Sequence, residues 1–272
     1  MKTKKTQPIG IFDSGIGGLG IFQKISHYLP NEDLVYFADN KNIPFGEKTV
    51  DELQKITENI FKFLIEKHNI KMAVIACNTA STICLSYLRK KFSIPIVGVV
   101  PVVKPMCEIT KTKKVAILAT PNTVNSFYLK DLIKQFAQGV KVFPVACSDL
   151  VFFVEQGEID SKRVEEKLKE YLGFVAKEQI DVIGLGCTHF PFLYKKIKEL
   201  LPKDIIILDS NDAVARQVVR VLSDNISNEN FKSNYIIYAT KDFDNFVNVA
   251  KKLLFDSNLQ MLQSQVKWFF HK

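Results

Sequence analysis

Two cysteines stand in the same local setting in two distant parts of the chain. Cys77 lies in MAVIACNT (residues 72–79) and Cys187 lies in VIGLGCTH (residues 182–189). Each follows an apolar run typical of a strand buried on both faces and precedes a helical pattern, so each is expected between a strand's C-terminal end and a helix N-terminus. Backbone N–H groups and the helix dipole favour thiolate there, which would lower the cysteine pKa from its usual ~8.5. The repeat therefore predicts paired thiol chemistry.

The remaining cysteines lack this setting. Cys84, Cys107 and Cys147 follow no comparable strand-to-helix junction, and we interpret them as small buried hydrophobic residues. No close CxxC pair occurs among the five cysteines, which argues against both a disulfide framework and a zinc ribbon. Cys77, Cys187 and His189 come from distant segments and have no evident fourth ligand, so we expect no metal.

Small polar residues accompany both cysteines. Asp13 follows the first predicted strand and could accept a hydrogen bond from, or tune, the first cysteine. His189, two residues after Cys187, could orient or protonate a reacting group, although a single histidine is more often structural. Such groups suit the ammonium and carboxylates of an amino acid, while each could instead cap a helix. The other polar candidates are Ser14, Asn78, Thr79, Thr123 and Thr188, with Glu155 weaker.

The elements that must position these residues alternate between strand and helix. The alternation predicts parallel sheets with right-handed crossovers, and the two halves of the chain match element for element. We therefore predict an α/β fold of two doubly wound parallel-sheet domains related by a pseudo-two-fold axis, with the active site between them. A helix at 213–222, a strand at 235–239 and a helix at 243–254 have no counterpart and should pack on the first domain. The predicted strands are 9–12, 34–38, 72–76 and 94–100 in the first half, and 115–119, 141–145, 181–186 and 205–208 in the second. Helices are expected at 20–28, 53–64, 79–92, from the end of the 120–123 loop to about 136, at 164–177 and at 192–201, and loops at 41–48, 120–123 and 148–157.

The candidate residues fall at the carboxyl ends of predicted strands, where open parallel sheets bind ligands. If the two halves face each other, their cysteines would approach one ligand from opposite sides.

A glycine-rich loop offers a competing interpretation. Gly15, Gly17 and Gly20 satisfy G-x-G-x-x-G, and Asp39 follows at the end of the second strand, so a nicotinamide or flavin site is formally possible. Asp13 argues against a dinucleotide site, because its negatively charged carboxylate would lie where the pyrophosphate must bind. We instead interpret the glycines as a tight turn with close backbone approach, and keep a dinucleotide-binding oxidoreductase as the alternative.

Composition excludes several classes of protein. The chain has 272 residues, 47% of them apolar, which is enough for about two domains. Its net charge of +8 comes mostly from lysines spread along the chain, without an arginine stripe, so a nucleic-acid partner is not expected. No apolar run is long enough for a secretory signal or a membrane span, and we expect a cytoplasmic protein.

Several motifs together resemble the glutamate racemases of the cofactor-independent Asp/Glu racemase superfamily, over nearly the whole chain. They are IGIFDSGIGGL (9–19), PFG (44–46), ACNTAS (76–81), ATPNTVNS (119–126), GLGCTHFPFL (184–193) and YATKDFDNFVNVAKKLL (238–254). The resemblance implies a first domain of residues 1–98 with 210–272 and a second of residues 99–209. It also implies interconversion of L- and D-glutamate without a cofactor, which supplies D-glutamate for peptidoglycan, and it allows for a homodimer.

The resemblance further assigns Cys77 and Cys187 as the two catalytic acid/bases. The reason is chemical: inversion at Cα without a cofactor removes a proton from one face and returns one to the other, so a thiolate and a thiol must flank Cα. The implied substrate contacts are Asp13, Ser14, Phe45, Gly46, Asn78, Thr79, Thr188 and His189. Phe45 replaces the family's usual tyrosine, and Asn122 replaces a frequent glycine.

Two alternatives remain beside this assignment. An aspartate racemase, another amino-acid racemase or a decarboxylase relative could use the same frame. A ligand-binding module of periplasmic type also has two facing α/β domains, but it would carry an export signal and would show no turnover.

Overall fold

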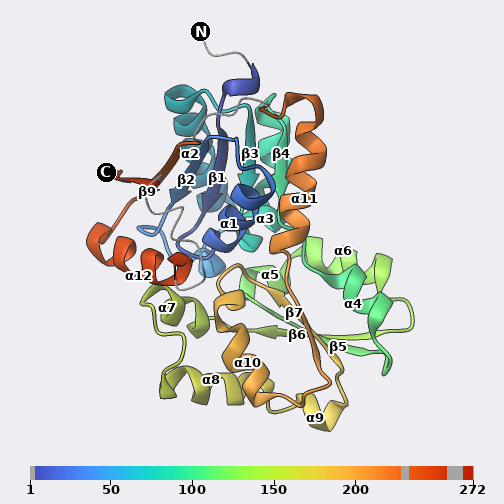
Figure 1. The fold of residues 1–272 in the computed structure, drawn as a ribbon. Coiled ribbons are helices and arrows are strands. Elements are labelled where there is room, and N and C mark those ends of the chain that lie inside the picture. The colour runs from blue at the N-terminus through green and yellow to red at the C-terminus, as the bar shows by residue number, and fades with distance from the viewer. Residues whose placement is uncertain (1–3, 228–232, 256–265, 272) are drawn as a thin grey trace.

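The computed structural model describes residues 4–227, 233–255 and 266–271, and its strands form two parallel sheets (Figure 1). The strands are β1 (Ile9–Asp13), β2 (Leu34–Ala38), β3 (Met72–Ile75), β4 (Ile96–Gly98), β5 (Lys114–Ala119), β6 (Lys141–Ala146), β7 (Val182–Gly186), β8 (Ile206–Leu208), β9 (Tyr235–Ala239) and β10 (Val266–Phe270). The first sheet has the order β10-β9-β2-β1-β3-β4 and the second has the order β6-β5-β7-β8. The order β2-β1-β3-β4 thus recurs as β6-β5-β7-β8, which confirms the predicted α/β fold with its duplicated parallel sheet.

Helices cover both faces of the sheets (Figure 1). They are α1 (Leu19–Tyr28), α2 (Val50–His68), α3 (Asn78–Lys91), α4 (Val103–Ile109), α5 (Pro121–Asn125), α6 (Phe127–Phe136), α7 (Asp149–Glu155), α8 (Lys162–Leu172), α9 (Val175–Glu178), α10 (Tyr194–Leu200), α11 (Asn211–Leu222) and α12 (Phe243–Phe255), with 3₁₀ turns η1 (Lys4–Thr6), η2 (Phe45–Glu47), η3 (Phe190–Leu193) and η4 (Ser223–Asn225). None of the described helices is long and apolar enough to cross a membrane.

Local sequence explains why the central strands and α2 form where they do. Strands β1, β2, β3 and β7 are buried along their whole length, as their near-continuous apolar runs require. Helix α2 begins with a capping box, in which Thr49 and Glu52 bond each other's backbone N–H, and it ends at Asn69 in the left-handed conformation.

The C-terminal elements return to the first sheet, as the sequence predicted. Strand β9 pairs with β2, and α11 packs against α1. Strand β10, which the sequence analysis did not predict, extends the same sheet beyond β9. Helix α12 also reaches the other half, because Lys252 Nζ donates to Gly157 O at 3.3 Å. Where the chain passes between the sheets, Ser210 Oγ donates to Val100 O at 3.0 Å and joins the two crossing segments.

Several elements differ from the prediction. The expected loop 148–157 contains α7, because Leu150, Phe153 and Val154 bury one apolar face of a short helix. The single helix expected at 164–177 is two helices, α8 and α9, which are separated at Gly173. Helices α4 and α5 were not predicted.

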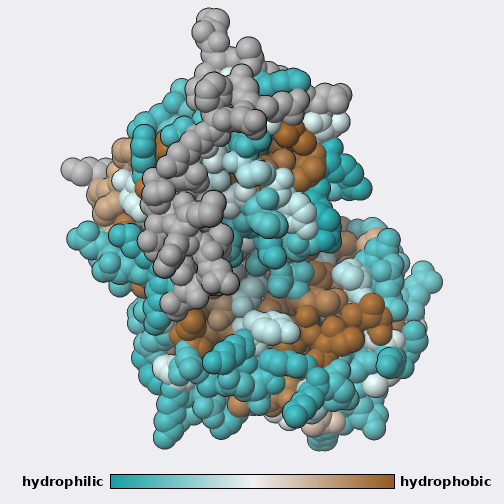
Figure 2. Space-filling model, viewed as in Figure 1, coloured by the Kyte–Doolittle hydropathy of each residue, from teal (hydrophilic) through white to brown (hydrophobic). Residues whose placement is uncertain are grey.

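The visible surface is largely hydrophilic, with apolar side chains gathered over the second sheet near the junction of the two halves (Figure 2). A lysine-rich surface of this kind agrees with a net charge of +8 spread along the chain.

Candidate active site

One cleft lies between the carboxyl ends of the two sheets. It has a volume of about 440 Å³ including its mouth. Both cysteines line it, one from each half of the chain. The other predicted residues that line it are Ser14, Phe45, Gly46, Asn78, Thr79, Thr188 and His189, and the lining residues that were not predicted as contacts are Ile43, Pro44, Glu47, Thr120, Pro121, Ser148 and Val151.

Cys77 lies two residues after the end of β3 and is the N-cap residue of α3. Its thiol is buried, and its Sγ lies 3.7 Å from Ser14 Oγ. Burial, together with the charge of Asp13, raises the pKa of Cys77 to about 12, although the backbone N–H of Ala80 acts in the opposite direction. The expectation of a lowered pKa is therefore wrong for Cys77, because desolvation of the thiolate outweighs the helix N-terminus.

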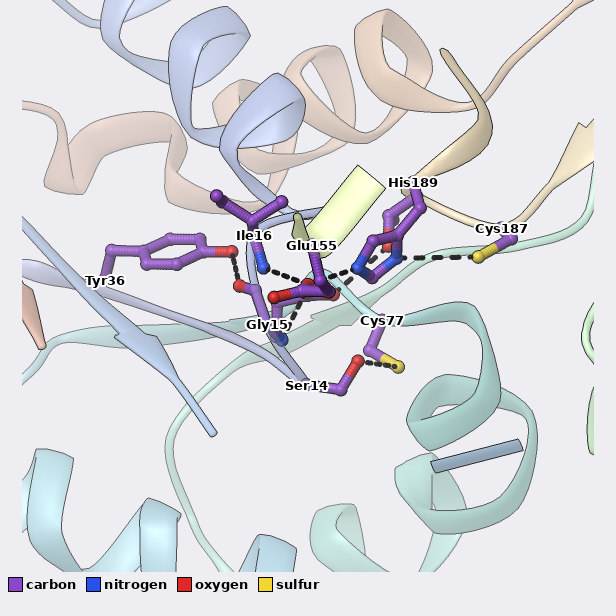
Figure 3. Close-up of polar contacts among 10 residues, drawn as sticks. Ser14, Gly15, Ile16, Tyr36, Cys77, Glu155, Cys187 and His189 are labelled. Atoms are coloured by element: carbon purple, nitrogen blue, oxygen red, sulfur yellow. Dashed lines mark hydrogen bonds and ion pairs between the residues drawn. The ribbon is translucent and has the colours of Figure 1, made fainter. Parts of the chain in front are cut away.

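Cys187 has a different environment. A 3₁₀ turn follows it in place of an α-helix N-terminus, so the predicted helix dipole is absent there. Its Sγ instead lies 3.7 Å from His189 Nδ1, and His189 Nε2 lies 2.6 Å from Glu155 Oε1 (Figure 3). Burial lowers the pKa of His189, but its hydrogen bonds to Cys187 and Glu155 prevail and hold that pKa well above the usual 6.5. His189 is thus an imidazolium at neutral pH, placed to donate to the Cys187 sulfur.

The Glu155–His189 pair packs closely against the glycine-rich loop. Glu155 Oε1 also accepts a hydrogen bond from Ile16 N at 2.7 Å (Figure 3). A Cβ on Gly15 would lie 2.1 Å from Glu155 Oε1, and a Cβ on Gly17 would lie 2.5 Å from His189 Nδ1. The glycines therefore permit close backbone approach, as interpreted from the sequence. A carboxylate of the chain itself occupies the loop at which a dinucleotide's pyrophosphate would bind, which disfavours the oxidoreductase alternative.

Two residues predicted as substrate contacts do not line the cleft. Asp13 is fully buried behind it, where Oδ1 accepts from Gly15 N at 2.8 Å and Oδ2 accepts from Thr188 Oγ1 at 3.2 Å. Burial raises the pKa of Asp13 from 3.8 to about 6, against the lowering influence of His189. Asp13 therefore acts on the cleft through its charge and its hydrogen bonds.

Thr123 is the second such residue. It is fully buried and pairs with Thr120 Oγ1 at 3.1 Å, while Thr120 Oγ1 lies 2.8 Å from Thr79 Oγ1. This chain of hydroxyls joins the two halves, and Thr120, rather than Thr123, faces the cleft.

Asn78, Phe45 and Gly46 contribute different groups to the wall of the cleft. Asn78 Nδ2 is buried without a hydrogen-bond partner, alone in this respect among the side-chain N and O atoms of the described residues. An unpaired buried donor is costly, so this amide is suited to a ligand oxygen. Phe45 packs its ring near Phe12, with ring centroids 6.0 Å apart, and a Cβ on Gly46 would meet Thr120 Cβ at 2.9 Å.

Glu155 is the main functional residue that the sequence indicated only weakly. Nothing in its neighbourhood along the chain marks it, because its partners Ile16 and His189 lie on other segments. In the part of the chain that the structure describes, no group of three or more His, Cys, Asp or Glu side chains could hold a metal ion.

The duplicated parallel sheets and the shared cleft with one thiol from each half define a two-domain α/β enzyme. The family model described as Asp/Glu/hydantoin racemase matches residues 9–218, and the chain belongs to this family.

Individual relatives are similar to this protein over most of its length. A glutamate racemase of Clostridium novyi is 37% identical over 251 residues, which cover 91% of this chain and 96% of that protein. One from Herpetosiphon aurantiacus is 41% identical, covering 80% of this chain and 86% of that protein. Among solved structures, a glutamate racemase isoform of Bacillus anthracis has a TM-score of 0.84 at 30% identity over 98% of both chains. The Escherichia coli glutamate racemase in complex with L-glutamate and an activator has a TM-score of 0.82 at 32% identity, covering 91% of this chain and 95% of that one.

Proposed function

We propose that this protein is a glutamate racemase that interconverts L- and D-glutamate without a cofactor, with Cys77 and Cys187 as its two acid/bases. The observation that carries the proposal is the cleft itself, because one thiol from each half of the chain lines it. The relatives named glutamate racemase, at 37% and 41% identity, support glutamate as the substrate. The aspartate racemase of Picrophilus torridus, at 18% identity, shares only the fold.

The two thiols have different surroundings, and we assign them different roles on that basis. A pKa of about 12 keeps Cys77 protonated at neutral pH, so it is ready to donate a proton. His189, whose pKa is held well above 6.5, lies with Nδ1 3.7 Å from Cys187 Sγ, so we assign Cys187 as the base whose sulfur anion the imidazolium would stabilise. Glu155 holds the imidazole in place through Nε2.

Racemisation then proceeds by two proton transfers. The Cα–H bond breaks as the Cys187 thiolate takes the proton, and the electron pair delocalises into the α-carboxylate. Cys77 delivers its proton to the opposite face of Cα, which forms the new C–H bond and leaves a Cys77 thiolate. The reverse reaction begins from that state, with the two thiols in exchanged roles.

The substrate contacts are proposed from the same cleft. Asn78 Nδ2 and the Thr79 and Thr188 hydroxyls are donors for carboxylate oxygens, and Asn78 is the best supported because its amide is otherwise unpaired. Ser14 and the backbone at Phe45 and Gly46 complete the wall.

Sheet membership supports the division into a first domain of residues 1–98 with 210–272 and a second of residues 99–209, since β5 to β8 form their own sheet. We further propose that the reaction supplies D-glutamate for peptidoglycan in the cytoplasm. A homodimer stays a prediction.

Circular dichroism of L-glutamate incubated with the pure protein tests the activity directly. Cys77→Ser and Cys187→Ser should each lower kcat by about 10²–10⁴-fold or more, because a hydroxyl is too weak a base at neutral pH. Cys107→Ser, which changes a thiol outside the cleft, should stay close to the parent rate.

An analogue that loses a leaving group on deprotonation then separates the two thiols. Each mutant keeps one cysteine and should eliminate from one enantiomer only, the L form for one mutant and the D form for the other. A Cys77→Ser or Cys187→Ser enzyme that racemised glutamate at the parent rate would disprove the two-thiol mechanism.

A further inference from the structure

A loop of the first half and the start of a short helix of the second face each other in the wall of the cleft. The loop contains η2, which follows β2, and the helix is α5, which follows β5 where the two halves meet (Figure 1). They approach so closely that a Cβ on Gly46 would lie 2.9 Å from Thr120 Cβ. The enclosed part of the cleft has room for only about one water molecule. An amino acid is larger than this space, so it can enter only when the cleft widens, and separation of this loop from α5 would widen it.

Asn122 joins the two walls. Its Nδ2 donates to Phe45 O at 3.1 Å and to Lys48 O at 2.8 Å, so one amide group bonds the carbonyls at both ends of the η2 turn. Lys48 N also donates to Phe45 O, at 3.3 Å, and the three groups form a closed set of hydrogen bonds.

The position of Asn122 differs from that of the other links between the halves. The Thr79–Thr120 and Asp13–Thr188 pairs are buried, whereas Asn122 is half-buried and so lies nearer to solvent. Among the links that touch the 45–48 loop, the Asn122 link is therefore placed to break when this loop moves away from α5.

The chemistry of the side chain fits this place. A carboxamide carries two N–H groups on one nitrogen, which matches two carbonyl acceptors, whereas a carboxylate has no donor and would repel them. Pro121 at the first position of α5 fixes the start of the helix and hence the direction of the next side chain.

We propose that Asn122 is a positioning residue that latches the 45–48 loop over the cleft and limits how often the cleft opens for glutamate to enter and leave. This inference rests on the proposed function for the identity of the ligand, but the latch itself is a property of the free protein. Loss of both hydrogen bonds should raise the open fraction about ten-fold, which corresponds to ~1.4 kcal/mol.

The cleft thiols report opening in the free enzyme, because both are buried when it is closed. Iodoacetamide labelling, measured for each cysteine peptide by mass spectrometry, should be about ten-fold faster at Cys77 and Cys187 in Asn122→Ala than in the parent. Asn122→Asp should label at least as fast. The matched control is Asn125→Ala, which removes an exposed amide from the same helix and should label at the parent rate.

The other three cysteines separate opening from general destabilisation. Labelling at Cys84, Cys107 and Cys147, which lie outside the cleft, should not change in Asn122→Ala. The proposal is overturned if the cleft thiols keep the parent rate, if Asn125→Ala accelerates them equally, or if all five cysteines accelerate together.

Saturating D-glutamate distinguishes the latch from the proposed function. It should slow labelling of both cleft thiols to the same low rate in the parent and in Asn122→Ala. Faster labelling in Asn122→Ala without any protection by glutamate would support the latch and contradict glutamate as the ligand. Protection by glutamate without an effect of Asn122→Ala would contradict the latch alone.

Discussion

Asp13→Asn should make the protein more stable at neutral pH while impairing the site. Asp13 is fully buried, and burial raises its pKa from 3.8 to about 6. Asparagine has nearly the same shape, and it can keep the hydrogen bond that Gly15 N donates and bond the Thr188 hydroxyl through its amide. The substitution therefore removes the buried charge and little else.

The size and sign of the effect follow from the pKa. A carboxyl whose pKa is higher in the folded state binds protons more tightly there, so its contribution to stability is most favourable below about pH 4 and is lost as the pH rises through 6. The difference of about two units corresponds to ~3 kcal/mol. Asparagine does not ionise, so the variant should gain ~3 kcal/mol over the parent at pH 7.5 and less than ~1 kcal/mol at pH 4.

Urea unfolding at these two pH values measures the difference in unfolding free energy between Asp13→Asn and the parent. The dependence of that free energy on urea concentration should be the same for both proteins. Asp204→Asn, at an exposed position, is the control and should change stability little at either pH. A variant that is less stable than the parent at pH 7.5, or a gain that does not depend on pH, would refute the raised pKa. Racemisation should meanwhile change unequally in kcat for the two directions, because the charge of Asp13 acts on the pKa of Cys77.

Two further predictions concern the other buried charges. Glu155→Gln removes a charge that raises the pKa of His189, so the alkaline limb of the pH profile of kcat should move to lower pH in the direction of reaction that Cys187 begins. An unmoved limb would contradict the role of His189 as an imidazolium. Lys71→Met should lower the free energy of unfolding by ~3–5 kcal/mol, because the Glu32 carboxylate, 2.6 Å from Lys71 Nζ and almost fully buried, would lose its partner. In urea unfolding, the double variant Glu32→Gln with Lys71→Met should lose less unfolding free energy than Lys71→Met alone, because no buried charge is left unpaired. An equal or larger loss in the double variant would show that the unpaired Glu32 charge is not the cause.

The sequence was sufficient for those features that depend on local pattern. Continuous apolar runs located the central strands, the alternation with helices specified parallel sheets, and the repeated setting of Cys77 and Cys187 predicted that both thiols lie at the carboxyl ends of strands, where they line one cleft. These inferences succeed because a buried parallel strand needs apolar side chains on both faces, and because carboxyl ends of parallel strands lie at one edge of their sheet. The helix within 148–157 was missed because its apolar face is one short turn that becomes favourable only against the rest of the fold.

Only the tertiary structure determined which groups meet and what their charges do. Glu155 reaches both Ile16 and His189, Asn122 reaches the 45–48 loop, and no periodicity connects these segments. The pKa of Cys77 rises where its place at a helix start predicted a fall, because the cost of burying a thiolate depends on everything packed around it. Hydrogen bonds and desolvation are set by distances in space, which local sequence does not contain, and they decide that Cys77 holds its proton in this cleft.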